Sequence, residues 1–357
     1  MTATNKRVAV VLFNLGGPDS LDAVRPFLFN LFNDGAIISA PGPLRWCLAQ
    51  LISRTRASSS QKIYAEMGGA SPLLDWTSKQ ARALEEQLAA RNVEAKAFIA
   101  MRYWKPLTAD AVEAVRAYDP DEIVLLPLYP QFSTTTTGSS LAEWQLRSRK
   151  AGLNKPVQVV CCYPEDPSFI KAHANVLEAA LTKVDAPARI LFSAHGLPEQ
   201  VIEKGDPYQS QVEKTSAAVM AELSARRPDT TFDWSVCYQS RVGPLKWIGP
   251  STDEEIARAA ADKIGILLTP IAFVSEHVET LVELDIEYRQ LAEELAAPFY
   301  VRAPALGLDE DFIDSLAESV VSACGMEHGV RRTGPGACAA DWTRCPMALE
   351  CSARRAA

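Results

Sequence analysis

The chain has 357 residues, enough for one large domain or two ordinary ones, and either can bury a sizeable hydrophobic core. Its net charge of −8 argues against nucleic-acid binding through a broad basic surface. No apolar run approaches the roughly 18 residues of a transmembrane helix. The run Val8–Phe13 is too short for the apolar core of a signal peptide, so we expect a cytoplasmic protein with reduced thiols.

Short β-rich runs alternate with helix-length segments along most of the chain. The predicted strands are 8–13, 95–101, 122–128, 157–161, 190–193, 231–236, 266–273 and 299–302. The predicted helices between them are 76–91, 108–118, 168–181, 207–225, 253–263 and 309–324. This alternation predicts right-handed βαβ units, and therefore an α/β fold with a parallel sheet covered by helices on both faces.

A weak internal repeat suggests two similar α/β halves. Leu12–Pro18 resembles Leu191–Pro198, and the apolar run 123–128 resembles 266–271, including its proline. Chance similarity of buried strands explains these pairs equally well. If the halves are real, the cleft between them holds the site. The predicted divisions are an N-terminal half at 1–160, a C-terminal half at 161–325 and a tail at 326–357.

Two of the four histidines follow strand-like runs. His195 comes directly after one apolar run, and His277 follows another, with Glu276 and Glu279 beside it. Ligands of parallel sheets bind beyond the carboxyl ends of the strands. An imidazole facing carboxylates can hold a divalent metal and accept protons, and burial would keep His195 neutral for that role. The alternative for His195 is a core histidine that bonds a backbone carbonyl.

A row of acidic residues begins beside His277. Glu276, Glu279, Glu283 and Glu287 are spaced by three, four and four residues, so they are expected on one helical face. A row that starts at a metal or proton site could conduct cations or protons outward. A solvated acidic face is the alternative.

A basic segment with an apolar face spans residues 37–53. Leu44, Leu48, Leu51 and Ile52 share a helical face, with Trp46 beside it and Arg45, Arg54 and Arg56 adding positive charge. Such a segment could rest on a membrane surface or hold an anionic, apolar ligand, and a plain packed helix is the alternative. The glycine-rich stretch 68–72 allows close backbone approach to a ligand, or simply makes a turn.

The C-terminal tail gathers three cysteines. Cys338, Cys345 and Cys351 are separated by six and then five residues, and Cys161 or Cys162 could supply a fourth ligand. The spacing matches no ferredoxin or zinc-ribbon pattern. An iron–sulfur cluster, a zinc site and free thiols therefore all stay open.

Ten short segments, taken together, resemble the ferrochelatases. They are Asn14–Pro18, Gly68–Pro72, Arg102–Tyr103, Tyr129–Gln131, Thr136–Ser140, Ser193–Pro198, Gly205–Tyr208, Gln239–Pro244, Trp247–Pro250 and Glu276–Leu281. They occur in order over roughly residues 8 to 305. The resemblance implies two Rossmann-like halves and a lyase that inserts Fe²⁺ into protoporphyrin IX to form protoheme. The alternatives are iron insertion into coproporphyrin, cobalt insertion into a corrin precursor, and a non-enzymatic carrier of heme or iron.

The resemblance also implies roles for individual residues. His195 and Glu279 match the residues that handle metal and protons, and His277, Glu283 and Glu287 match polar residues along the route from the site. The positions that match the porphyrin pocket are Leu15, Arg56, Tyr64, Ser71, Arg102, Tyr103 and Trp247. Arg56, Tyr64 and Ser71 among them match positions that hold the propionates. A peripheral membrane contact and a homodimer are left open.

Some members of the family carry a [2Fe-2S] cluster held by three tail cysteines and one internal cysteine. The resemblance implies that Cys338, Cys345 and Cys351 are the tail ligands, although their spacing differs from that of the animal enzymes. The internal ligand position of those enzymes corresponds to Thr134, so Cys161 or Cys162 takes its place.

Overall fold

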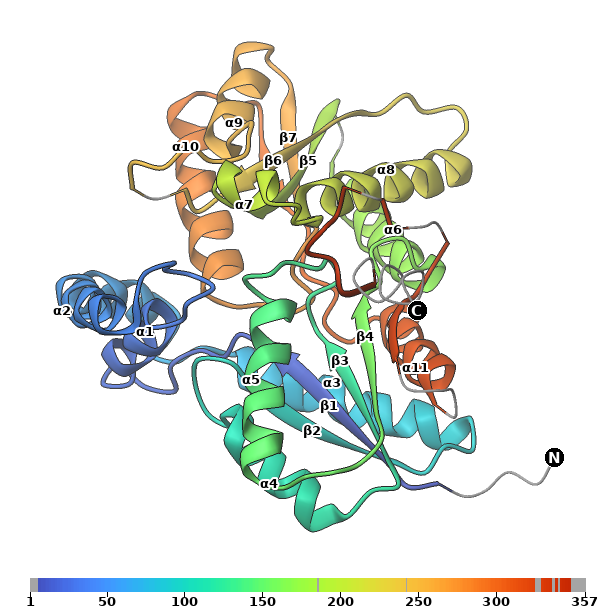
Figure 1. The fold of residues 1–357 in the computed structure, drawn as a ribbon. Coiled ribbons are helices and arrows are strands. Elements are labelled where there is room, and N and C mark those ends of the chain that lie inside the picture. The colour runs from blue at the N-terminus through green and yellow to red at the C-terminus, as the bar shows by residue number, and fades with distance from the viewer. Residues whose placement is uncertain are drawn as a thin grey trace. The chain divides into compact units, whose positions relative to one another are not determined.

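The computed structural model describes residues 6–184, 186–241, 243–324, 329–335, 338–339 and 341–347 (Figure 1). These residues form two compact units. The first contains described residues within 1–129, 133–161 and 316–331, and the second those within 130–132, 162–315 and 332–357. The predicted tail ligand Cys351 lies outside the described residues.

The first unit is built on a five-stranded sheet in the order β2-β1-β3-β4-β9. Its strands are β1 (Val8–Asn14), β2 (Ala95–Met101), β3 (Glu122–Pro127), β4 (Val157–Cys162) and β9 (Gly329–Arg332). Its helices are α1 (Val24–Phe32), α2 (Gly42–Glu66), α3 (Leu73–Ala90), α4 (Thr108–Tyr118) and α5 (Thr137–Lys150). β1 is buried along its whole length and pairs in parallel with β2 and β3, which explains its unbroken apolar sequence.

The second unit is built on a four-stranded sheet in the order β6-β5-β7-β8, with parallel pairing throughout. Its strands are β5 (Ala188–His195), β6 (Asp233–Gln239), β7 (Gly265–Pro270) and β8 (Tyr300–Arg302). Its helices are α6 (Pro167–Leu181), α7 (Glu199–Glu203), α8 (Tyr208–Arg226), α9 (Thr252–Ala261), the π-helix η1 (Glu279–Glu287) and α10 (Tyr288–Glu294). Helix α11 (Glu310–Ala323) follows β8 and runs from the second unit into the first.

The core of the second unit holds η1 against the sheet. Leu284 of η1 and Tyr288 of α10 pack in one buried cluster with Leu191 of β5 and Leu268 of β7. This packing places the first turn of η1 beside the carboxyl ends of the strands, where a parallel sheet binds its ligands. The core therefore fixes the helix whose polar face carries the predicted site residues.

The predicted α/β fold with parallel pairing is confirmed, in the form of two sheets. The division at residues 160 and 325 stays a prediction. Helices α1, α5, α7 and α10 were not among the predicted helices. In addition, β9 forms in the predicted tail, and residues 279–287 form a π-helix in place of an α-helix. Among the described residues, no helix combines the length and apolar character needed to cross a bilayer.

Candidate active site

His195 and Glu279 form the centre of the candidate site in the second unit. His195 is the last residue of β5, and Glu279 is the first of η1. His195 Nδ1 lies 2.9 Å from Glu279 Oε2, and the histidine side chain is 39% exposed while the carboxylate is 21% exposed. The pair therefore joins a strand end to a helix start and stays accessible from one side.

The end of β6 supports two carboxylates of η1, those of Glu279 and Glu283. Gln239 Nε2 donates to Glu279 Oε2 over 3.3 Å, and the Ser240 backbone N–H donates to Glu283 Oε1 over 2.8 Å. The Ser240 hydroxyl donates to Glu283 Oε2 over 2.5 Å. Sequence reasoning did not assign roles to Gln239 and Ser240, although their position directly at a strand end beside His195 was a usable signal.

The charges of the site differ from the sequence-based expectation. Burial lowers the pKa of His195, but the attraction and hydrogen bond of Glu279, together with Glu283, outweigh it, so the net pKa is raised. Burial alone would also raise the pKa of Glu279, yet His195 holds it at about 2. Burial therefore acts on the pKa of His195 in the predicted direction, but the neighbouring carboxylates oppose it and favour the protonated imidazole more than burial disfavours it.

Two other groups near the pair are the ones able to take up protons. Burial lowers the pKa of His277 more than Glu279 and Glu276 raise it, so this imidazole is neutral. Its Nε2 lies 3.9 Å from Glu279 Oε1. Burial and then the charge of Glu279 raise the pKa of Glu283 to about 7. The bonded pair of His195 and Glu279 is thus flanked by a neutral imidazole and by Glu283, whose pKa lies near neutral pH.

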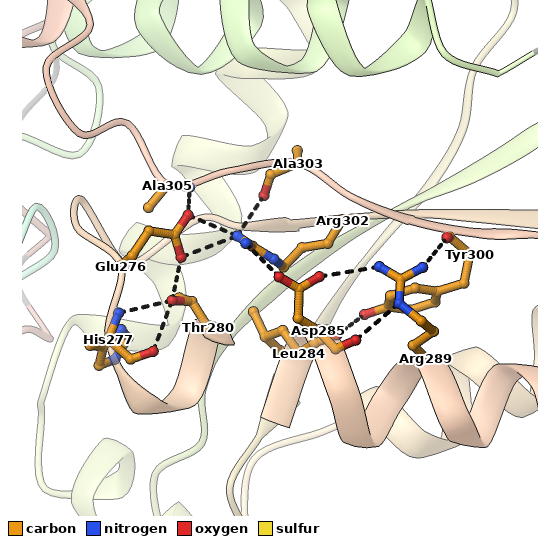
Figure 2. A network of polar contacts seen from close by, with 10 residues as sticks. All are labelled: Glu276, His277, Thr280, Leu284, Asp285, Arg289, Tyr300, Arg302, Ala303 and Ala305. Carbon is orange, nitrogen blue, oxygen red and sulfur yellow. Dashed lines mark hydrogen bonds and ion pairs between the residues drawn. The ribbon is translucent and has the colours of Figure 1, made fainter. Parts of the chain in front are cut away.

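The predicted acidic row does not lie on one face. Glu276 precedes η1 and contacts Arg302 (Figure 2). Glu279 and Glu283 instead contact His195 and Ser240. Glu287, at the end of η1, is exposed. The prediction of a single four-membered row is wrong because the helix begins only at Glu279, so Glu276 belongs to the preceding loop.

Trp247 is the predicted pocket residue that lies beside this site within the second unit. A Cβ on Gly196 would meet the Trp247 ring at 3.3 Å and the Gln239 carbonyl oxygen at 2.9 Å. Only glycine fits at this position, directly after His195. The tryptophan ring therefore packs against the backbone that orients the histidine.

The other six predicted substrate residues belong to the first unit. Arg56 is exposed on α2, Tyr64 is buried near its end, and the Ser71 hydroxyl accepts from the Leu73 N–H. Leu15 accepts a hydrogen bond from the backbone of Tyr103 through its carbonyl. Among these six predicted substrate residues, Arg56 is therefore the one that exposes a positive charge.

Arg102 and Tyr103 belong to a network centred on Asp34, which sequence reasoning missed. Asp34 Oδ2 accepts from the Tyr103 hydroxyl (2.8 Å) and the Ser139 hydroxyl (2.5 Å), and pairs with Arg102 Nη2 (2.9 Å). Arg102 Nε also donates to Ser139 Oγ. The network joins the segment after α1, the end of β2 and the first turn of α5, and it uses the Arg102 guanidinium internally.

We expect Asp34→Asn to destabilise the first unit by about 3 kcal/mol, because it leaves the Arg102 cation, whose side chain is 17% exposed, without its carboxylate. Ser139→Ala is the matched control and should cost about 1 kcal/mol, since it removes a hydrogen bond and no charge. Urea unfolding of both variants measures the difference. Equal losses would contradict a charge-centred network.

The tail places two of the predicted cysteine ligands together. Cys345 is buried, and its Sγ lies 3.7 Å from Cys338 Sγ. The hydrogen bond from Cys345 and then burial raise the pKa of Cys338 far above its usual value, and the charges of Cys345 and Cys162 raise it further. Within the described part of the chain, no three or more His, Cys, Asp or Glu side chains form a group that could hold a metal ion.

Comparison with solved structures shows the class of fold. SirB from Bacillus subtilis with Fe³⁺ matches with a TM-score of 0.52 over 90% of this chain and 96% of that one, at 13% identity. The sirohydrochlorin chelatase SirB from Bacillus subtilis subspecies spizizenii in complex with cobalt matches with a TM-score of 0.51 at 11% identity, over 89% and 95% of the two chains. The fold is that of the chelatases.

Sequence comparison then shows the family. A family profile described as Ferrochelatase matches residues 7–324. The ferrochelatase of Caulobacter vibrioides (strain NA1000 / CB15N) is 57% identical over 346 residues, which cover 96% of this chain and 97% of the relative. That of Phenylobacterium zucineum is 55% identical over 343 residues, covering 95% and 97%. The chain belongs to the ferrochelatase family, the lyases that insert ferrous iron into protoporphyrin IX.

Proposed function

We propose that this chain inserts Fe²⁺ into protoporphyrin IX with His195 and Glu279 as the point where the metal arrives. The observation that carries the proposal is the 2.9 Å pair of an imidazole and a carboxylate at the carboxyl end of a parallel strand. Glu279 supplies an anionic oxygen to the cation, and His195 supplies a nitrogen in the fraction of molecules in which its imidazole is neutral. A site of two ligands holds the metal weakly, as suits a metal that must move on to the porphyrin.

Insertion also releases two pyrrole protons, and the site contains acceptors for them. Glu283 has a pKa of about 7, so it can take up a proton near neutral pH. The neutral imidazole of His277 is a weaker base, because burial lowers its pKa, and it can receive a proton in transit. Glu287, exposed at the end of η1, would pass protons on toward solvent. In this assignment, His195 and Glu279 receive the metal, and His277 and Glu283 receive the protons.

We also propose that Leu15, Arg102, Tyr103 and Trp247 line the porphyrin site, and that Arg56, Tyr64 and Ser71 hold the propionates. The exposed Arg56 guanidinium supports a role with carboxylates. Arg102 and Tyr103 would act as walls held by Asp34, since their polar atoms are already bonded.

The experiment that tests the function is anaerobic Fe²⁺ insertion followed by loss of free-base porphyrin absorption. Turnover with protoporphyrin IX and a lower kcat/KM with coproporphyrin is the expected result. Retained heme affinity without turnover on either porphyrin, in folded protein, would favour the carrier instead. The visible spectrum of the same sample, recorded beforehand, also tests for a cluster.

We propose that the tail binds a [2Fe-2S] cluster through Cys338, Cys345, Cys351 and Cys162. The supporting observations are that the thiols of Cys338 and the buried Cys345 lie within 4 Å of each other, and that the charge of Cys162 acts on Cys338. Such a cluster takes four thiolates and, when bound, can store an electron. Cys162 is favoured over Cys161 because it shares a compact unit with the two described tail cysteines. The raised pKa of the Cys338 thiol means that cluster assembly would displace a proton there.

We expect Cys345→Ser to abolish visible iron–sulfur absorption in freshly purified protein, because a hydroxyl is a poor substitute for a thiolate ligand of iron. Cys162→Ser should have the same effect, and its neighbour Cys161→Ser is the matched control that should keep the spectrum. An unchanged spectrum in Cys345→Ser would remove this residue from the ligand set. Loss in Cys161→Ser with retention in Cys162→Ser would reverse the internal assignment.

A peripheral membrane contact through α2 is the last part of the proposal. Leu44, Trp46 and Leu51 on this helix are 55%, 51% and 60% exposed, and Arg54 and Arg56 beside them are also exposed. An exposed apolar face with cations at its edge is typical of helices that rest on anionic lipid. A homodimer stays a prediction.

A further inference from the structure

Arg302 bonds two carboxylates, that of Glu276 in the loop before η1 and that of Asp285 within η1 (Figure 2). It is the last residue of β8. Its Nη1 donates to Glu276 Oε1 over 2.9 Å, and its Nη2 donates to Asp285 Oδ2 over 2.7 Å. The Arg302 side chain is only 9% exposed. One buried guanidinium therefore ties the loop before η1 and the second turn of η1 to the edge of the sheet.

Both carboxylates are themselves held from other directions. Glu276 accepts from the Ala305 backbone N–H (2.9 Å) and from the Thr280 hydroxyl (2.5 Å). Asp285 pairs with Arg289 of α10, which also donates to the Tyr300 carbonyl. The network thus continues from the loop through η1 to α10 and back to β8, as Figure 2 shows.

The residues of the proposed site lie between these two anchors in sequence. His277 and Glu279 follow Glu276 directly, and Glu283 precedes Asp285 by two residues. On the other side of the segment, Glu279 and Glu283 meet His195 and Ser240. The segment is a π-helix, a rare backbone form that persists where its surroundings hold it in place. Arg302 fixes this segment through Glu276 and Asp285, whereas Glu279 of the same segment contacts His195.

We propose that Arg302 is a positioning residue for iron insertion, which fixes the segment from Glu276 to Asp285 so that Glu279 meets His195. The inference rests on the proposed function of the His195–Glu279 pair. Arg302 itself touches neither of these two residues in the contacts described above, so its effect is transmitted through Glu276 and Asp285. The planar guanidinium suits the task, because it can bond two carboxylates at once in fixed directions.

The test compares Arg302→Met with Arg189→Met in the full chain. Arg189 lies at the start of β5, at the opposite end of the same sheet, and bridges Asp233 and Asp262 with a side chain that is also 9% exposed. Both variants lose a buried guanidinium bridging two carboxylates, so both should lower the unfolding temperature. Only Arg302→Met should lower kcat for Fe²⁺ insertion, by about 10–100-fold, since a displacement of the order of 1 Å can have that effect.

The kinetic pattern separates positioning from stability. KM for protoporphyrin should stay unchanged in Arg302→Met while kcat falls, and Arg302→Lys should recover part of kcat because an ammonium keeps one of the two carboxylate contacts. If Arg302→Met does not fold, Arg302→Lys and Asp285→Asn give the same comparison. Equal kcat in the arginine variants, well below their unfolding temperatures, would overturn the inference.

His195→Ala, measured in the same series, distinguishes a failure of the proposed site from a failure of the positioning role alone. An active His195→Ala would remove the proposed site. An inactive His195→Ala together with an Arg302→Met as active as Arg189→Met would leave the site in place and reject the positioning role alone.

Discussion

His195→Ala should lose nearly all Fe²⁺ insertion, by about 10²–10⁴-fold in kcat, while the fold stays intact. The imidazole contributes a metal-binding nitrogen and completes an ion pair with Glu279 at 2.9 Å. Its removal leaves a buried carboxylate without its cation and the arriving metal with one ligand fewer. The measurement is anaerobic insertion into protoporphyrin IX, with near-ultraviolet circular dichroism to confirm packing.

His173→Leu is the matched control for that experiment. His173 is also in the second unit, is 2% exposed, and packs against Phe169 on α6 with ring centroids 4.8 Å apart. Burial lowers its pKa to about 3, so this histidine is a neutral core residue. The control should keep kcat. Activity of His195→Ala above about a tenth of the wild-type rate would remove the role assigned to His195.

The fold was predictable from sequence because its strands are buried on both faces. The runs at 8–13 and 190–193 are almost wholly apolar, and the structure has β1 and β5 there, pairing in parallel. The run at 95–101 matches β2 residue for residue. β9 was not predictable in the same way, because Gly329–Arg332 carries two arginines and neither an apolar run nor an alternation.

The residues of the site were predictable, but their charges and supports were not. The strand-end rule finds His195, and the spacing of acidic residues finds Glu279 and Glu283. Which histidine is neutral depends on the balance of burial against nearby charge, and this balance needs distances. The contacts of Arg302 were missed for a related reason. Its two partners, Glu276 and Asp285, lie 26 and 17 residues before it in the sequence.

Glu279→Gln should reduce kcat/KM for Fe²⁺ by more than about 100-fold, because the amide offers the metal no anionic oxygen while it keeps the shape of the side chain. Anaerobic insertion at varied Fe²⁺ measures this loss. In metal-free protein, NMR titration of the imidazole should show the pKa of His195 falling below its usual value, since burial lowers it and the main opposing charge is gone. Both effects have the same origin in the Glu279 carboxylate.

Glu255→Gln is the control that separates this effect from the loss of any buried carboxylate. Glu255 is 5% exposed, lies on α9 of the same unit, and bonds Ser235 and Arg258 outside the site. It should lower stability and leave both the kinetics with Fe²⁺ and the His195 titration unchanged. If Glu279→Gln lowered kcat/KM while the His195 pKa stayed raised, Glu283 would be the dominant charge on the histidine.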